Sequence, residues 1–186
     1  MPDEALIVRA LSFVTLAGDL FIVCYFVLSL IETFIIRRPT MLSRLLSQWG
    51  LLILFFVAGT ASLGSLTFSE VLGWEPCKDC WFQRVFMYSQ ALLLAFAFLR
   101  RDRGIAPYAI LLSLVGMVFS INQYVGQIRS ILLPALAGTC EDPLVDCSVS
   151  QIFQFGYITI PMMAFTAFAM IALVAWAMIR QRPRSA

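Results

Sequence analysis

The chain has 186 residues, of which 61% are hydrophobic and 13% are charged, and its formal net charge is +2. Soluble domains are typically about 45 to 50% apolar and about 25% charged, so this composition indicates a membrane protein. The small, scattered positive charge gives no reason to expect a nucleic-acid partner. The absence of histidine excludes histidine-ligated haem, histidine-containing metal sites and imidazole bases.

The first predicted membrane span lies within residues 10–36, before the basic sequence Arg-Arg-Pro at 37–39. A span needs about 20 residues to cross a hydrocarbon core of about 30 Å. If the crossing begins near Asp19, this residue is expected to cap the helix at the interface, with a proton relay as its alternative role. The acidic N-terminus and the long apolar run argue against a cleaved signal peptide.

Four more spans are predicted from the gaps between charged residues, and three of these gaps are long enough without help: 45–69, 104–128 and 147–179. The remaining gap, between Arg84 and Arg100, holds only 15 uncharged residues and would reach about 22 Å. Its helix is therefore expected to begin near Cys80, which places Arg84 about one turn inside the span. The sequence thus predicts five transmembrane helices.

The basic residues predict the orientation of these helices. Nine of the thirteen lie at alternate connections, within 37–44, 100–103 and 180–184, and this side is cytoplasmic by the positive-inside rule. Four cysteines fall in the two loops on the opposite side, which is expected to be oxidising: Cys77, Cys80, Cys140 and Cys147. In the second of these loops, the apolar spacing of residues 127–136 predicts a short helix in the interface plane.

Cys77 and Cys80 form a Cys-x-x-Cys pair at the start of a predicted helix, where the helix dipole favours a thiolate. Arg84 follows Cys80 by four residues, so their side chains project from the same face. Its guanidinium is placed to stabilise a thiolate and to hydrogen-bond an oxygen of an electron acceptor. The alternative is that Arg84 snorkels to lipid headgroups.

Cys140 and Cys147 are interpreted either as a structural disulfide or as the second pair of a two-step relay. A zinc site built from all four loop cysteines fits less well, because the six residues between Cys140 and Cys147 exceed the usual ligand spacing. Cys24 lies in an apolar run and is expected to behave as a small apolar residue.

Three sequence features resemble the disulfide-bond formation protein B family, the membrane thiol oxidases of the DsbB/BdbC type. They are Trp-Glu-Pro-Cys-Lys-Asp-Cys-Trp-Phe-Gln-Arg-Val-Phe-Met-Tyr at 74–88, the cysteine pair in the next outer loop, and Phe-Gly-Tyr-Ile-Thr-Ile-Pro at 155–161. The resemblance implies an all-α integral membrane protein with a four-helix transmembrane bundle over residues 45–180. Residues 1–44 would add one extra N-terminal transmembrane helix and a basic connection, and 181–186 a basic tail.

The same resemblance implies a function and a role for each cysteine. Such a protein re-oxidises an extracytoplasmic thioredoxin-like (DsbA-type) partner and passes the electrons to the membrane quinone pool, with ubiquinone or menaquinone and no metal as cofactor. Cys80 would contact the quinone with Arg84 beside it, and Cys77 would complete that pair. Cys140 would form the mixed disulfide with the partner and Cys147 would bridge transiently to Cys77, although these two roles remain interchangeable. The expected location is the plasma (inner) membrane, with both cysteine loops extracytoplasmic.

Two alternatives stay open. Vitamin K epoxide reductase-like enzymes also use a helical bundle and two cysteine pairs, but in them the loop pair precedes the Cys-x-x-Cys pair, which is the reverse of the order here. The other alternative is a non-enzymatic membrane subunit with structural disulfides. A relay would show redox states that change when quinone is withheld, whereas structural disulfides would stay oxidised.

Overall fold

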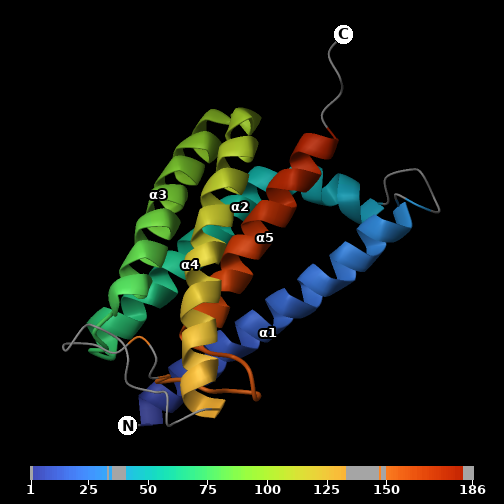
Figure 1. Cartoon of the computed structure of the whole chain (residues 1–186). Coiled ribbons are helices and arrows are strands. Elements are labelled where there is room, and N and C mark those ends of the chain that lie inside the picture. Colours follow the sequence, from blue (N-terminus) through green and yellow to red (C-terminus); the bar gives the residue numbers. More distant parts are fainter. Residues whose placement is uncertain (1, 33, 35–40, 133–146, 148–149, 182–186) are drawn as a thin grey trace.

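The computed structural model describes residues 2–32, 34, 41–132, 147 and 150–181. Within this part of the chain lie five long α-helices and no β-strand (Figure 1). The helices are α1 (Pro2–Ile31), α2 (Met41–Leu66), α3 (Lys78–Arg100), α4 (Ala106–Leu132) and α5 (Ile160–Arg180). All five are long and apolar enough to cross a membrane, which confirms the predicted all-α integral membrane protein.

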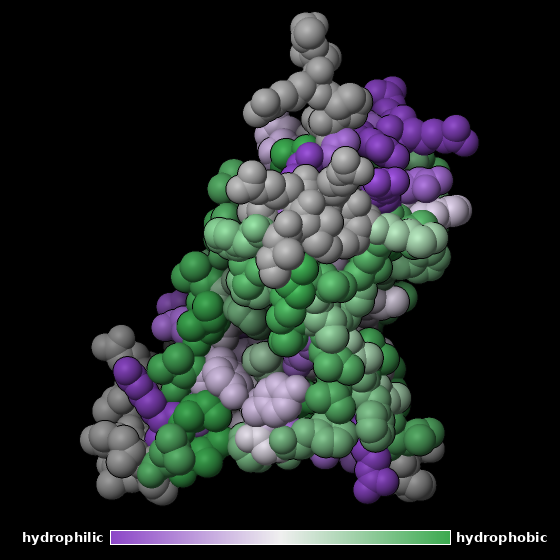
Figure 2. Space-filling model, turned by 90° about the vertical axis from the view of Figure 1, so that its right-hand side faces the viewer, coloured by the Kyte–Doolittle hydropathy of each residue, from purple (hydrophilic) through white to green (hydrophobic). Residues whose placement is uncertain are grey.

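The helices α2 to α5 form a four-helix bundle, and α1 is the extra N-terminal helix. Neighbouring members of the bundle pack along their length, and α5 contacts both α2 and α4. Helix α1 packs mainly on α5 and runs obliquely to it, so that the two diverge toward the C-terminal end of α1 (Figure 1). On the face seen in Figure 2, hydrophobic side chains cover the middle, and most strongly hydrophilic ones gather toward the two ends.

Small residues on α4 allow the close approach of α5. Ala109, Ser113 and Gly116 are buried at helical spacing on α4, and Gly116 faces α5. The Phe168 side chain of α5 is fully buried against the backbone at Gly116, where a Cβ atom would overlap its ring. Small residues are the usual means by which membrane helices pack tightly, since lipid offers no hydrophobic driving force for their association.

One end of the bundle carries the connections that matter for the site. Helix α2 continues as a π-helical turn, Thr67–Val71, and the chain then reaches Cys77, whose extended backbone forms the N-cap of α3. Before α5, Phe155 and Gly156 have positive φ angles of 52° and 79°, and a bridge between Gln154 and Ile158 closes the turn.

Three predicted boundaries were wrong. The last span begins at Ile160 rather than 147, because the uncharged residues 150–159 form the turn before α5. Residues 127–132 continue α4 instead of starting a separate interfacial helix, and 133–136 lie outside the described residues. Helix α1 begins at Pro2, so Asp19 lies inside the helix and does not cap it.

Candidate thiol–disulfide site

Cys77 and Cys80 lie together where α3 begins. Their Sγ atoms are 3.5 Å apart, and the Cys77 thiol donates a hydrogen bond to Cys80. A disulfide would need about 2.05 Å, so no disulfide joins the two sulfurs in this structure, and they lie close enough to form one after a small movement. Cys77 is buried and Cys80 is half-buried. The predicted proximity of the two sulfurs at a helix N-terminus is therefore present.

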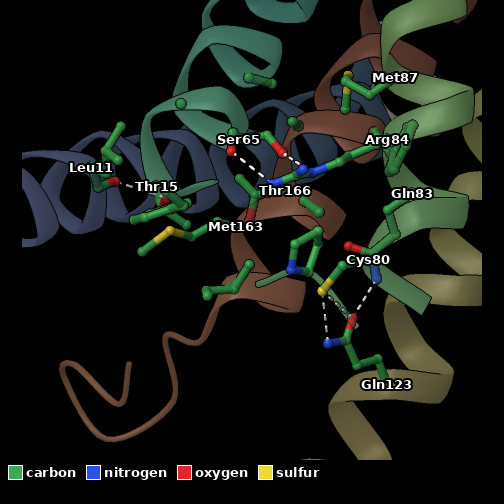
Figure 3. A pocket seen from close by; sticks show the side chains of 18 of the residues that line it. Leu11, Thr15, Ser65, Cys80, Gln83, Arg84, Met87, Gln123, Met163 and Thr166 are labelled. Atoms are coloured by element: carbon green, nitrogen blue, oxygen red, sulfur yellow. Dashed lines mark hydrogen bonds between the residues drawn. The ribbon is translucent and has the colours of Figure 1, made fainter. Parts of the chain in front are cut away.

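One glutamine contacts this pair, and a second one bonds to the first (Figure 3). Gln123 of α4 donates from its Nε2 to the Sγ of Cys80 at 3.2 Å and to that of Cys77 at 3.3 Å. Gln83 of α3 donates to the Gln123 Oε1 at 2.7 Å. Because its oxygen is held by Gln83, the Gln123 amide presents its N–H groups to the sulfurs.

The charge distribution distinguishes the two sulfurs. The hydrogen bond from Cys77 to Cys80 raises the pKa of the Cys77 thiol, and burial and a negative charge on Cys80 act in the same direction. Cys77 therefore stays protonated. Cys80 receives hydrogen bonds from Cys77 and Gln123 and lies in the first turn of α3, where the helix dipole favours negative charge.

Arg84 is held toward the inside of the bundle. Its Nε donates to the Ser65 Oγ and its Nη2 to the Ser65 carbonyl oxygen, both at 3.0 Å. Its guanidinium also lies 5.6 Å from the centre of the Trp81 ring, a cation–π contact. The side chain is therefore held against Ser65 near the C-terminal end of α2 (Figure 3).

Cys80 and Arg84 both line a cavity of about 250 Å³ whose surface is mainly apolar. Met87, Met163 and Phe168 contribute to its apolar lining. Gln127 also lines the cavity, and its Oε1 is buried without a hydrogen-bond partner among the described residues. The cavity therefore suits a ligand that is mostly apolar and carries oxygens able to meet a guanidinium or an amide.

The second cysteine pair is only partly described. Cys147 is half-buried, lines the same cavity, and its side chain interacts with that of Cys77. Cys140 lies outside the described residues. Cys24 is exposed on α1 and does not line the cavity. Among the described side chains, no group of three or more Cys, Asp or Glu residues is arranged to hold a metal ion.

Several residues of the site were missed in the sequence. Gln83 stands within the motif at 74–88, and Gln123 and Gln127 occur four residues apart in the uncharged span 104–128. Polar amide side chains within predicted spans were therefore the available signal. Ser65 offered no such signal. Its role depends on where α2 lies relative to Arg84 in the fold.

The Cys-x-x-Cys pair lies at one end of the helical bundle, and a further cysteine lines the same cavity. This arrangement is typical of membrane proteins that carry out thiol–disulfide exchange. The family model of disulfide bond formation protein DsbB matches residues 47–178. The chain belongs to this family, and it is therefore a membrane disulfide-formation protein that exchanges disulfides with a thiol partner.

Curated relatives agree with this assignment. The chain is 41% identical to the probable disulfide formation protein C of Halalkalibacterium halodurans over 128 residues, which cover 69% of this chain and 91% of the relative. It is 35% identical to the probable disulfide formation protein C 1 of Bacillus anthracis, covering 74% and 93%. It is 37% identical to the probable disulfide formation protein of Coxiella burnetii (strain Dugway 5J108-111), covering 68% and 85%. Comparison with solved structures gives no significant match.

Proposed function

We propose that the protein is a thiol:quinone oxidoreductase of the plasma membrane. It takes two electrons from an extracytoplasmic thioredoxin-like, DsbA-type protein through Cys140 and Cys147. It passes them through Cys77 and Cys80 to ubiquinone or menaquinone in the membrane. Both cysteine loops are extracytoplasmic in this proposal, because the basic residues gather at the opposite connections.

The observation that carries the proposal is the shared cavity of Cys80 and Arg84. The apolar lining suits a lipid-soluble ring, and the guanidinium can donate to a ring oxygen. The unpartnered Oε1 of Gln127 can accept from a ring hydroxyl after reduction. These residues therefore fit both the oxidised and the reduced form of a quinone. The quinone would be the oxidant and would take up two electrons and two protons.

The cysteines can carry out the thiol steps in sequence. A donor thiolate attacks Cys140 of the Cys140–Cys147 disulfide and releases the Cys147 thiolate. Cys147 then attacks the Sγ of Cys77 in the oxidised Cys77–Cys80 pair, and Cys80 leaves as a thiolate. The second donor thiol resolves its mixed disulfide, so the donor leaves oxidised and Cys140 is freed. Cys140 then attacks Cys147, which re-forms the loop disulfide and leaves Cys77 and Cys80 reduced.

The local geometry supports this order of events. The Cys147 side chain interacts with that of Cys77, so Cys77 is taken as the sulfur that Cys147 attacks. Cys80 is the better leaving group because it lies in the first turn of α3, where the helix N-terminus favours its negative charge. The electrons thus arrive at the sulfur that lines the cavity together with Arg84.

Reconstitution in lipid vesicles tests the proposal. Purified protein is mixed with quinone and a reduced thioredoxin-like donor, and quinone absorbance is followed together with donor thiols. We expect quinone reduction by the native chain and by Cys24→Ser, and none by Cys80→Ser. Undiminished quinone reduction by Cys80→Ser would refute the site.

Trapping experiments test the loop pair. In Cys147→Ser, the Cys140 thiolate can attack the disulfide of the oxidised donor and release one donor thiol. The resulting mixed disulfide between the donor and Cys140 is expected to accumulate, because Cys147 is no longer present to resolve it. If the donor is trapped on Cys147 in a Cys140→Ser variant instead, then Cys147 reacts with the donor and Cys140 is the sulfur that bridges to Cys77. In a membrane subunit with structural disulfides, both pairs would stay oxidised when quinone is withheld.

A further inference from the structure

Helix α1 precedes the residues that match the family model, yet it borders the cavity of the proposed acceptor site. Four of its residues line that cavity together with Cys80 and Arg84: Leu11, Val14, Thr15 and Gly18. In Figure 3, Leu11 and Thr15 lie on the far side of the cavity from Cys80. The wall opposite the reactive sulfur therefore comes from a segment outside the matched residues.

Polar contacts and close packing hold α1 against the bundle. Asp19 accepts a hydrogen bond from the Tyr157 hydroxyl at 3.0 Å and another from the Thr166 hydroxyl at 2.6 Å. An acidic residue within a span is costly unless it has polar partners or faces the bundle interior, and Asp19 is hydrogen-bonded to two hydroxyls of the bundle. At Gly18, a Cβ would lie 3.0 Å from the Thr166 Cγ2, so the absence of a side chain permits the close approach.

Leu11 lies where α1 meets α2. A Cβ on Gly64 of α2 would be 3.5 Å from the Leu11 Cδ2, which is ordinary contact distance. Apart from such contacts, α1 packs mainly on α5. Leu11 therefore forms part of the cavity wall where α1 meets α2, on the side away from Cys80 (Figure 3).

We propose that α1 is a wall of the quinone pocket and that Leu11 determines which quinones fit against it. The inference rests on the proposed function. With the ring at Cys80 and Arg84, the apolar part of the molecule points toward the opposite wall, where Leu11 and Thr15 lie. The wall limits the volume open to ring substituents and to the first part of an isoprenoid chain, so its side chains contribute to quinone selection.

Matched tryptophan substitutions on α1 test this inference. Leu11→Trp fills the cavity, whereas Leu20→Trp changes a residue that is 64% exposed on the same helix and does not line it. We expect Leu11→Trp to raise the KM for quinone roughly tenfold or more, the scale at which pockets discriminate by size. Leu20→Trp is expected to leave the KM unchanged. Unchanged quinone KM in a folded Leu11→Trp variant would overturn the inference.

Photolabelling of the native chain gives a readout that depends neither on turnover nor on the folding of a variant. An azido-substituted short-chain quinone is bound in vesicles, illuminated, and its attachment sites are mapped by mass spectrometry. We expect label within residues 11–18 of α1 as well as near Cys80, and competition by unlabelled quinone. Label near Cys80 but not on α1 would disprove the proposal that α1 is a wall of the quinone pocket, and it would leave the proposed function intact. No specific label anywhere would overturn both.

Discussion

The Nε2 of Gln123 lies 3.2 Å from the Sγ of Cys80, although 43 positions separate the two residues in the sequence. The hydrogen bond from Gln83 to the Gln123 Oε1 sets the direction of this amide. A sulfur that accepts an N–H hydrogen bond is better able to carry negative charge. Helix α4 thus contributes directly to the chemistry at the start of α3.

Replacing Gln123 tests this contact. Gln123→Leu removes the donor, and a hydrogen bond to a charged group contributes about 1.5 to 3 kcal/mol, so quinone reduction by the pre-reduced protein is expected to slow roughly tenfold or more. Stopped-flow measurement of quinone absorbance gives this rate. The neighbouring amide in Asn122→Leu serves as control, because Asn122 is exposed and bonds to Asp79 instead. Equal rates in the two variants would contradict the role of Gln123.

The second prediction concerns Arg84 and its support by Ser65. Arg84→Ala is expected to raise the KM for quinone roughly tenfold or more, since a hydrogen bond to a charged donor contributes about 1.5 to 3 kcal/mol. Ser65→Ala should have a smaller effect, because the bond to the Ser65 carbonyl remains. Arg100→Ala is the control, as Arg100 stacks on Phe96 near the other end of α3. Steady-state kinetics separate quinone use from donor oxidation, and an equal loss of both in Arg84→Ala would argue against its role at the acceptor.

The raised pKa of Cys77 gives a pH-dependent prediction. Only the thiolate reacts with iodoacetamide, so in the reduced protein Cys77 should begin to react at a higher pH than in the unfolded chain. Cys80→Ala removes the largest cause of the shift, so the pKa of Cys77 falls and its reaction moves to lower pH. Peptide-resolved mass spectrometry over a pH series measures both profiles. Steric shielding of the sulfur would slow the reaction at every pH without moving its midpoint, so an unshifted midpoint in the native protein would disprove this account.

The fourth prediction concerns the packing of α4 on α5. A methyl group at Gly116 would overlap the ring of Phe168, whereas nothing lies within 4 Å of a Cβ at Gly126 on the same helix. Overpacking costs about 1 to 3 kcal/mol, so Gly116→Ala is expected to lower the unfolding temperature in detergent. Gly126→Ala should leave the temperature unchanged or raise it, because alanine favours a helix over glycine. Tryptophan fluorescence measures the unfolding temperatures of the two variants. Equal unfolding temperatures would contradict the close contact between Gly116 and Phe168.

The sequence by itself determined the class of fold and the first part of the site. Uncharged stretches of sufficient length must be helical in lipid, because every backbone polar group needs an internal partner there. The number of spans followed from this rule. The four-residue interval between Cys80 and Arg84 placed both on one helical face without knowledge of the other helices. Helix ends were less certain, since a missing charge does not show whether residues 150–159 continue a helix or turn.

Only the tertiary structure decided which residues of different helices meet. The contact of Gln123 with Cys80, the support of Arg84 by Ser65 and the position of α1 beside the cavity all depend on how the helices pack. Spacing along one helix says nothing about its neighbours, because the small residues and polar contacts that orient membrane helices act across the bundle. Asp19 illustrates the difference: it was expected at a helix end, and in the fold it links α1 to Tyr157 and Thr166.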